Sequence, residues 1–551
     1  MMMDGGCNVD ARCVATGVPT KRQWTWESRL SILFYWCMVA FVILTFRRHG
    51  ISNDELVQHT YGDMLWRYYA SSLTDTSLFS YRNLYLYGGA FDLPVVALLK
   101  LVPSISIWDL RHLLSGLVGV VGLVGTGRLA TYLYGPRMGL LAIALLALCG
   151  IWSGAMFTHT KDIPFATAMI WGVYTLTRIV SCLPQVPLSL GLGFGLSTGL
   201  ALGLRVGGGL LVCYAALVIF FCGVSCSGLW RDRVLFWFRS ACSLFPGMCL
   251  AFVLMAFFWP WSVQQFDHIP LAIKAFSNFS FEIDTILSGT VYQVDDVPRT
   301  YLPIYLLVKM SEPVLLGLFC GILVLAVRWR ALIQARQSIL WIPVVAAAVC
   351  PVLLALITNP PLYNGVRHFL FVVPPLVILS AAGLYTVCIR VAAVSSVAAR
   401  RFFFAVFGAV CLLSAVPLVL IHPYGYVGYN ILAGGLSGAV GRWEMDYWSS
   451  SVKDALVGLQ QYALPRDTGG EYRVAVCAEL VQADAVLGPG FRVVADWLQA
   501  DFFVSATQMG CDAAMDGDVV VEVRRLGVPL AVVKDLRPVQ ERPVGYPVIV
   551  R

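Results

Sequence analysis

Long apolar stretches recur along the chain from Leu30 to Ile421, separated by shorter polar segments. Each stretch is close to the ~20 residues that a helix needs to cross the hydrocarbon core of a bilayer. Hydropathy reading finds about eleven of them. The predicted spans are Leu30–Phe46, Trp108–Leu129, Met138–Phe157, Ile163–Val180, Leu188–Leu204, Gly207–Cys226, Leu235–Trp259, Tyr301–Ala326, Leu340–Leu356, Phe369–Ile389 and Phe402–Ile421. The pattern predicts a polytopic α-helical membrane protein.

The pattern changes after Ile421, where helix-like and strand-like segments alternate. Residues 447–463 have helical periodicity, and short apolar runs bounded by turn residues are typical of buried strands. These runs are Arg473–Ala478, Phe502–Ser505, Val519–Val523 and Leu530–Val533. We therefore expect an N-terminal segment (1–29), a membrane domain (30–421) and a small water-exposed α/β domain (422–551).

Two loops of the membrane domain are long, at residues 47–107 and 260–300, and both are rich in aromatic residues. Loops of this length are usually functional or disordered, and their aromatic content argues against disorder. Within the first, Asp54–Tyr69 has the pattern of an amphipathic helix lying at the membrane interface.

Composition and charge agree with this picture. The hydrophobic fraction is 58% and the charged fraction only 13%, about half the charged share of a soluble protein. The net charge of +7 follows membrane topology and is not a nucleic-acid signal. With the N-terminus in the cytoplasm, the inner loops collect the arginines, as the positive-inside rule requires. They are Arg137, Arg231, Arg233, Arg328, Arg330, Arg336, Arg390, Arg400 and Arg401, after Lys21, Arg22 and Arg29. The C-terminal domain then lies on the outer face.

The cysteines do not have the spacing of a zinc site. Most are scattered singly through apolar stretches, where they act as small hydrophobic residues. Cys477 and Cys511 fall in the outer domain, where an oxidising compartment would allow them to pair; spacing alone leaves both the paired and the free state open.

The acidic pair Asp54-Glu55 follows the first predicted span and begins the interfacial helix. A carboxylate near the membrane surface can take a proton from an acceptor hydroxyl, as general-base catalysis requires. The same pair also fits an ordinary helix start, where acidic residues interact well with the helix dipole.

A basic and acidic cluster, His159-Thr160-Lys161-Asp162, stands between the third and fourth predicted spans. Lys161 and His159 could bind phosphate at the start of the following helix, where free N–H groups favour anions. Asp162 could equally be a helix cap, with Pro164 in the first turn.

Two arginines stand inside or at the edge of predicted spans: Arg205, before three glycines, and Arg367, before His368. Arginine is costly at such positions and is a functional candidate by default. Guanidinium groups match phosphate geometry, whereas the structural alternative is snorkelling toward the lipid head groups.

Aromatic residues gather where the last span meets the outer domain. Tyr424 and Tyr426, together with Tyr61 of the interfacial helix, are candidate contacts for an acceptor or a sugar. Such aromatics also form ordinary interfacial belts. No metalloprotease, P-loop or nucleophile-elbow motif is present in the sequence.

In their order along the chain, these features resemble the C-type glycosyltransferase superfamily. Asp54-Glu55 follows the first span, Lys161-Asp162 the third, and Arg367-His368 a later loop, before the outer domain. Within the superfamily the chain looks like bacterial relatives of the dolichyl-phosphate-mannose protein mannosyltransferases (glycosyltransferase family 39) and of the lipid A aminoarabinose transferase. The likeness covers nearly the whole chain in layout but specific residues only in patches.

The resemblance implies transfer of a sugar, with inversion, from a polyprenyl-phosphate donor to an acceptor hydroxyl or amine on a lipid, glycan or protein. Asp54 would be the base or orient the acceptor, and Glu55 its companion. Lys161, Asp162 and His159 would lie near the donor phosphate, with Arg205, Arg367 and His368 stabilising the leaving group. It also implies a bacterial inner membrane with the site on the periplasmic face. No protein metal ligand is implied, and a divalent cation remains open as cofactor.

Three other functions fit the layout less well. A transporter or lipid flippase tends to place charges at mid-membrane and to show repeated halves, and we find few such charges and no repeat. An envelope polymerase or ligase with a pyrophosphate-linked donor differs from the transferase in donor identity. A structural scaffold would leave the outer acids and arginines unexplained.

Overall fold

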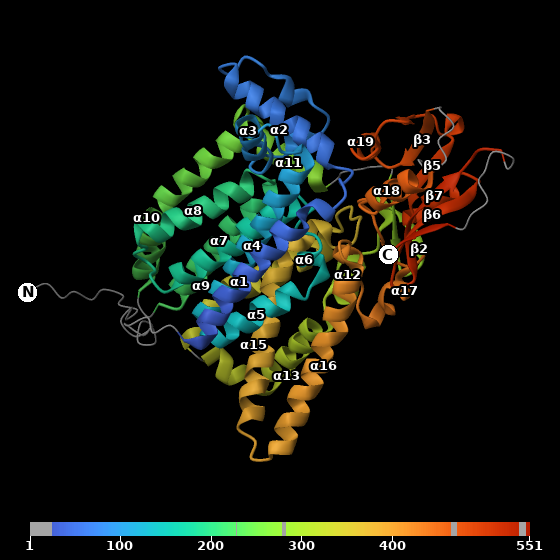
Figure 1. Cartoon of the computed structure of the whole chain (residues 1–551). Coiled ribbons are helices and arrows are strands. Elements are labelled where there is room, and N and C mark those ends of the chain that lie inside the picture. The colour runs from blue at the N-terminus through green and yellow to red at the C-terminus, as the bar shows by residue number, and fades with distance from the viewer. Residues whose placement is uncertain (1–24, 227–228, 278–282, 335, 464–470, 539–546) are drawn as a thin grey trace, which may run out of the picture.

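The computed structural model describes residues 25–226, 229–277, 283–334, 336–463, 471–538 and 547–551. Most of the chain forms a body of packed helices, and a smaller sheet-containing domain lies at one side of it (Figure 1). Most of the segment predicted as residues 1–29, and Glu282 of the second long loop, lie outside the described residues.

Helices fill the region of the predicted spans. Within the described ranges, nine are long and apolar enough to cross a membrane. These are formed by α1 (Trp26–Thr45), α4 (Ile107–Tyr134), α7 (Asp162–Val180), α9 (Leu210–Val224), α10 (Trp230–Phe258), α13 (Glu312–Gln334), α14 (Ile342–Thr358), α15 (Val373–Ala392) and α16 (Val397–Ile421), some extended by 3-10 turns. Two further apolar helices, α5 (Pro136–Ala147) and α8 (Leu188–Leu202), are shorter. The polytopic helical class is confirmed, whereas the count of eleven spans is not.

Two of the predicted spans are interrupted. Met138–Phe157 becomes α5 and the single turn α6 (Gly150–Ser153), and Tyr301–Ala326 becomes α12 (Tyr301–Lys309) and α13. Between α12 and α13 the backbone of Met310 is extended. The amide of Asn430 donates to the carbonyl oxygens of Leu307 and Met310, at 2.7 and 2.8 Å. A side chain distant in sequence thus satisfies acceptors that the helix break leaves free.

Close helix contacts use glycine. At Gly195 of α8 a Cβ atom would lie 2.0 Å from the carbonyl oxygen of Gly247 in α10. Small residues let membrane helices approach closely and gain dispersion energy, so this pair sets the spacing of α8 and α10.

The first long loop forms two helices, α2 (Glu55–Ala70) and α3 (Asp92–Leu101), which lie together at one end of the helical body (Figure 1). The predicted helix at Asp54–Tyr69 is confirmed. Tyr61 and Leu65 are fully buried in it, in a cluster with Leu78 and Leu93. The second loop contains α11 (His268–Ser277) and the antiparallel hairpin of β1 (Asp284–Leu287) and β2 (Thr290–Gln293).

The C-terminal domain consists of α18 (Val452–Ala463), the short α19 (Leu480–Asp484) and a mixed sheet in the order β4-β3-β5-β7-β6-β8. Its strands are β3 (Tyr472–Cys477), β4 (Phe491–Val493), β5 (Phe502–Ala506), β6 (Asp518–Arg525), β7 (Val528–Asp535) and β8 (Val548–Val550). The four predicted strands are present, and Cys477 is disulfide-bonded to Cys511.

The helix predicted from Tyr447 begins only at Val452. Before it, the carboxylate of Asp446 accepts hydrogen bonds from the backbone N–H groups of Ser450 and Ser451, at 3.0 and 2.8 Å. Ser449 has a left-handed φ of 54°. The residues from 447 to 451 therefore form a tight turn, although their side chains have helical periodicity.

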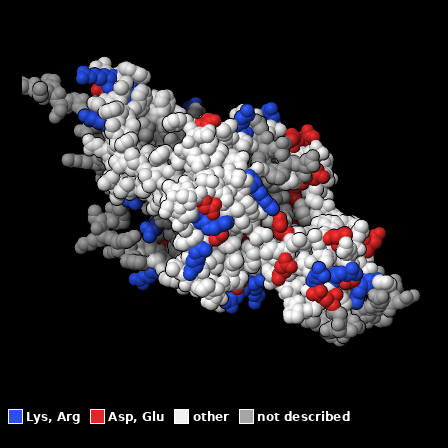
Figure 2. Space-filling model, turned by 90° about the horizontal axis from the view of Figure 1, so that it is seen from above, with Lys and Arg blue, Asp and Glu red and all other residues white. Residues whose placement is uncertain are grey.

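Polar contacts from α18, β6 and α19 hold the sheet-containing domain against the end of the helical body. Lys453 of α18 donates to the carbonyl oxygen of His49 (3.1 Å), and Arg525 of β6 to that of His422 (3.2 Å). Gln482 of α19 donates to the side-chain oxygen of Asn53 at 2.8 Å. Charged side chains of both signs gather on the C-terminal domain, whereas much of the helical body in this view has none (Figure 2).

Candidate functional site

Four charged residues from distant parts of the chain meet at one end of the helical body. Asp54 precedes α2, Asp162 begins α7, Arg205 precedes a 3-10 turn (Val206–Gly209), and Arg367 begins another (Arg367–Val372). Nη2 of Arg367 lies 2.7 Å from Oδ2 of Asp54, and its Nε lies 3.4 Å from Oδ2 of Asp162. Arg205 forms an ion pair with Asp162. The two carboxylates and two guanidinium groups therefore alternate in one chain of contacts.

These groups differ in their access to solvent. The side chain of Asp162 is 3% exposed, and those of Arg367 and Arg205 are 10% and 12% exposed, whereas that of Asp54 is 37% exposed. Asp54 is thus the member that a molecule arriving from outside can reach, and the guanidinium groups lie in a shielded setting where charge interactions are strong.

Lys161 lies beside this cluster. Its Nζ is 4.0 Å from the centroid of the Tyr87 ring, and the guanidinium carbon of Arg205 is 5.9 Å from the same ring. Burial lowers the pKa of Lys161 to about 8, and the neighbouring charge of Asp92 opposes that shift. Near neutral pH the ammonium is mostly protonated, so the site gains a third cation.

His159 is held by the segment that leads into the outer domain. Its Nε2 lies 2.7 Å from the hydroxyl oxygen of Tyr447 and accepts from the indole N–H of Trp448 at 3.1 Å. Burial lowers the pKa of His159, so the ring is neutral and can accept these bonds. The ring of Trp448 also lies 4.2 Å from the guanidinium carbon of Arg367, a cation–π distance.

A small cavity adjoins these residues. His159, Arg367, Tyr426 and Tyr447 line it, together with Lys309 and several apolar side chains. The hydroxyl group of Tyr426 is bound to the carboxylate of Asp446, and its ring makes an edge contact with His159. Tyr426 is therefore a wall of the site with its polar end already occupied.

The other candidates from the sequence have different surroundings. Tyr424 donates to Asp454 at 2.5 Å, at the joint with the outer domain. Tyr61 is fully buried and donates to the carbonyl oxygen of Tyr87 at 2.9 Å. His368 packs edge-on against Tyr363, with ring centroids 4.8 Å apart. None of these three contacts the alternating charges directly in the interactions that the structure records.

Glu55, the first residue of α2, points away from the neighbouring Asp54 and into the interior. Its carboxylate is fully buried and lies 3.1 Å from Nε2 of His112. Next to this pair, Arg111 binds Asp92 at 2.9 Å and the side-chain oxygens of Gln58 and Thr160, each at 3.1 Å. This buried network ties α2, α3, α4 and the residues before α7 together beneath the site.

Sequence reasoning missed several residues of the site and its support. Arg111 stands inside a predicted span, and that position alone marks it as a candidate. Tyr87, whose ring faces Lys161 and Arg205, carries no local signal in the sequence. Trp448 belongs to the aromatic stretch where the last span meets the outer domain, which the sequence did mark as a candidate sugar contact. Within the described ranges, no three histidine, cysteine, aspartate or glutamate side chains gather as metal ligands.

The arrangement suits an anion next to a reactive hydroxyl or amine. Three buried cations can stabilise negative charge that develops on a phosphate, and a low-dielectric setting strengthens that effect. The exposed carboxylate of Asp54 can accept a proton within reach of the same cations.

No protein-family model matches the chain, and no curated protein is similar to it in sequence. Solved structures with a similar course of the chain include ArnT from Cupriavidus metallidurans bound to undecaprenyl phosphate (15% identity, 91% of this chain and 97% of that chain, TM-score 0.46). The oligosaccharyltransferase AglB from Archaeoglobus fulgidus, in complex with an inhibitory peptide and a dolichol-phosphate, has 13% identity over 88% of this chain and 70% of that chain (TM-score 0.47). The arabinofuranosyltransferase AftD from Mycobacteria has 15% identity over 91% of this chain and 40% of that chain (TM-score 0.41).

Proposed function

We propose that this chain is a membrane glycosyltransferase that moves a sugar from a polyprenyl-phosphate donor to an acceptor hydroxyl or amine. The observation that carries the proposal is the position of Arg367, whose guanidinium contacts both the exposed carboxylate of Asp54 and the buried carboxylate of Asp162. A base and a phosphate-binding cation are thereby neighbours, as a displacement at an anomeric carbon requires.

In the proposed reaction, Asp54 takes the proton of the acceptor while the acceptor oxygen or nitrogen attacks the anomeric carbon. The bond from that carbon to the phosphate oxygen breaks, and polyprenyl phosphate leaves with the electron pair, so the configuration inverts. Arg367, Arg205 and Lys161 stabilise the charge on the departing phosphate. The neutral His159 ring holds the side chains of Tyr447 and Trp448 in place beside Arg367 through its hydrogen bonds to both. A hexose or pentose donor, and a lipid, glycan or protein acceptor, are all compatible with this chemistry.

We further propose that the reaction takes place at the periplasmic face of a bacterial inner membrane. The support is the arginine content of the opposite loops, which the positive-inside rule assigns to the cytoplasm.

The test compares the purified wild type with Asp54→Asn in detergent, using a panel of polyprenyl-phosphate sugars and acceptor extracts. General-base catalysis contributes roughly 10²–10⁴-fold, so we expect donor consumption to fall by that factor. Asp63→Asn is the matched control, because Asp63 lies on the same helix in a surface ion pair with Arg67 (3.2 Å), and it should keep wild-type activity.

A thermal unfolding curve confirms that both variants are folded. Full activity in folded Asp54→Asn would rule out the assignment of the base. A wild type that consumes none of the donors with any extract would move the transporter or flippase alternative ahead.

A further inference from the structure

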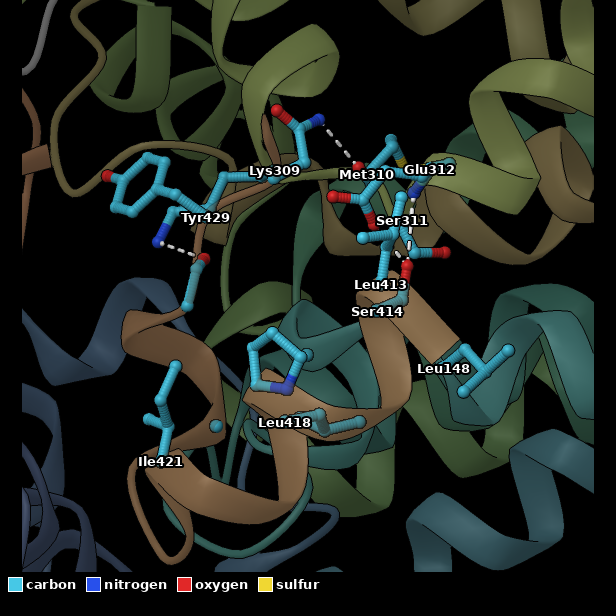
Figure 3. A pocket seen from close by; sticks show the side chains of 15 residues that line it. Leu148, Lys309, Met310, Ser311, Glu312, Leu413, Ser414, Leu418, Ile421 and Tyr429 are labelled. Atoms are coloured by element: carbon cyan, nitrogen blue, oxygen red, sulfur yellow. Dashed lines mark hydrogen bonds between the residues drawn. The ribbon is translucent and has the colours of Figure 1, made fainter. Parts of the chain in front are cut away.

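A second cavity lies where the end of α16 meets the junction of α12 and α13 (Figure 3). One wall is apolar and is formed by Leu413, Pro417, Leu418 and Ile421 of α16. Polar side chains, among them Lys309, Glu312 and Ser414, line the rest. An elongated molecule with a polar head and an apolar chain would match this division.

The apolar wall belongs to a helix that the rest of the chain hardly covers. In the apolar stretch of each helix that is long enough to cross a membrane, only 11% of the residues of α16 and 17% of those of α13 are buried. Val416 and Val419 of α16 are 51% and 73% exposed. Leu413, which lines the cavity, is also 51% exposed. Exposed apolar side chains on a spanning helix face lipid, so this wall of the cavity borders the bilayer.

Glu312 carries a charge that the protein leaves without a counter-ion. Its carboxylate accepts from the hydroxyl of Ser414 and from the backbone N–H of Ile431 at 3.0 Å. No lysine, arginine or histidine of the described ranges forms an ion pair with it. A carboxylate has about four acceptor positions, so roughly two remain for a ligand.

Lys309, in the same cavity, is a basic residue without a carboxylate partner. It is 6% exposed, and its Nζ donates to the carbonyl oxygens of Tyr426 and Gly428, at 2.9 and 3.3 Å. The ring of Tyr429 lies 3.5 Å from the Nζ. In the part of the chain that the structure describes, no carboxylate lies within ion-pair distance of the Nζ. Burial lowers the pKa of Lys309 well below its usual range, and the charge of Glu444 opposes that shift. Burying a cation so incompletely matched is costly.

We propose that this cavity binds a zwitterionic phospholipid with a primary amine, that is, a phosphoethanolamine head group. The ammonium group of the lipid binds Glu312, its phosphate lies toward Lys309, and an acyl chain follows Leu418 and Ile421. The ammonium of the lipid then compensates the charge of Glu312, and its phosphate supplies the counter-ion that a protonated Lys309 lacks. The two cavities share Lys309 as a lining residue, but the proposal does not depend on the transfer chemistry described above.

The experiment measures bound lipid by native mass spectrometry and the unfolding temperature of the delipidated protein after addition of one lipid at a time. Phosphatidylethanolamine should bind and stabilise more than phosphatidylglycerol, which lacks the amine. It should also exceed phosphatidylcholine, whose methylated ammonium cannot donate a hydrogen bond.

Two variants test the parts of the cavity separately. Glu312→Gln should abolish the preference for phosphatidylethanolamine, and Leu418→Trp, which fills the apolar wall, should reduce retention of all three lipids. Leu412→Trp is the control, because Leu412 is 60% exposed on the same helix and does not line the cavity. Equal binding of the three lipids by the wild type, a preference for phosphatidylglycerol, or an unchanged preference in folded Glu312→Gln would overturn the proposal.

Discussion

Arg367 connects the two halves of the charged cluster, because a single guanidinium contacts Asp54 and Asp162 through different nitrogen atoms. A lysine at this position keeps the charge but has only one nitrogen and a different reach. The geometry at the site therefore depends on the shape of the side chain as well as on its charge.

We expect Arg367→Lys to lower kcat/KM for the lipid-linked donor roughly ten- to a hundredfold, since a hydrogen bond to a charged group contributes about 1.5–3 kcal/mol. Steady-state kinetics measures the loss, and the unfolding temperature reports whether the fold is kept. Wild-type kinetics in a folded Arg367→Lys protein would show that the bridge between the carboxylates is dispensable.

The pKa of Lys161 predicts that the proposed activity depends on pH. Burial lowers its pKa to about 8, so the ammonium is present below that pH and is lost as the pH rises through it. A phosphodiester donor keeps its negative charge over this range. We therefore expect kcat/KM for the donor to fall as the pH rises from about 7 to about 9, with its midpoint near the pKa of Lys161.

Lys161→Arg should remove this dependence, because a guanidinium stays protonated. Lys161→Met should be impaired at every pH and serves as the second variant if arginine does not fit. A wild-type profile that stays flat across pH 8 would exclude Lys161 from donor binding.

Site residues were predictable from the sequence where a charged residue stood inside or at the end of an apolar span. Arg205 and Arg367 were identified because charges inside or at the edges of apolar spans are costly, and Lys161 because it stands at a helix start that favours anions. The structure brings them together with Asp162. Glu55 was paired with Asp54 because the two are adjacent and because the resemblance implies such a pair. Consecutive residues of a helix point about 100° apart, which is why Glu55 turns instead to His112 in the interior.

At the scale of elements, the single turn α6 packs directly against the loop that carries Tyr426. A Cβ atom on Gly154 would lie 2.2 Å from the backbone nitrogen of Tyr426 and 2.3 Å from the carbonyl carbon of Gly425. Real Cβ atoms do not approach backbone so closely, so only glycine allows this contact.

We expect Gly154→Ala to lower stability by about 1–3 kcal/mol, the usual cost of overpacking, and to reduce activity because Tyr426 and the His159 contact must shift. Gly408→Ala is the matched control. Nothing lies within 4 Å of a Cβ at Gly408 in α16, so that change should be neutral or slightly stabilising. Thermal unfolding in detergent compares the two, and equal unfolding temperatures would contradict the expected clash.

Elements were predictable from hydropathy where the helix is continuous. The break between α12 and α13 at Met310 was not predictable from hydropathy, because it is stabilised by Asn430, about 120 residues later in the chain. The short strands β4 and β8 were missed for a related reason: each has three residues, too few for a period of two to be recognised.

At the scale of the whole molecule, the orientation in the membrane remains a prediction from charge. Leu498 is 86% exposed on the C-terminal domain, and Ser395 is exposed between α15 and α16. In intact cells a membrane-impermeant thiol reagent should add label to Leu498→Cys above the wild-type background. Ser395→Cys should gain label only after the membrane is permeabilised, because it lies on the opposite side. The reverse result would place the C-terminal domain in the cytoplasm.

The contact between Gln482 and Asn53 has a mechanical consequence. Asn53 immediately precedes Asp54, so the C-terminal domain holds the chain next to the candidate base by a side chain of its own. Any swing of that domain that admits a bulky acceptor must either break this bond or move Asp54 with it. The contact therefore links the position of the C-terminal domain to that of Asp54: a protein with the domain swung away would also have a displaced carboxylate.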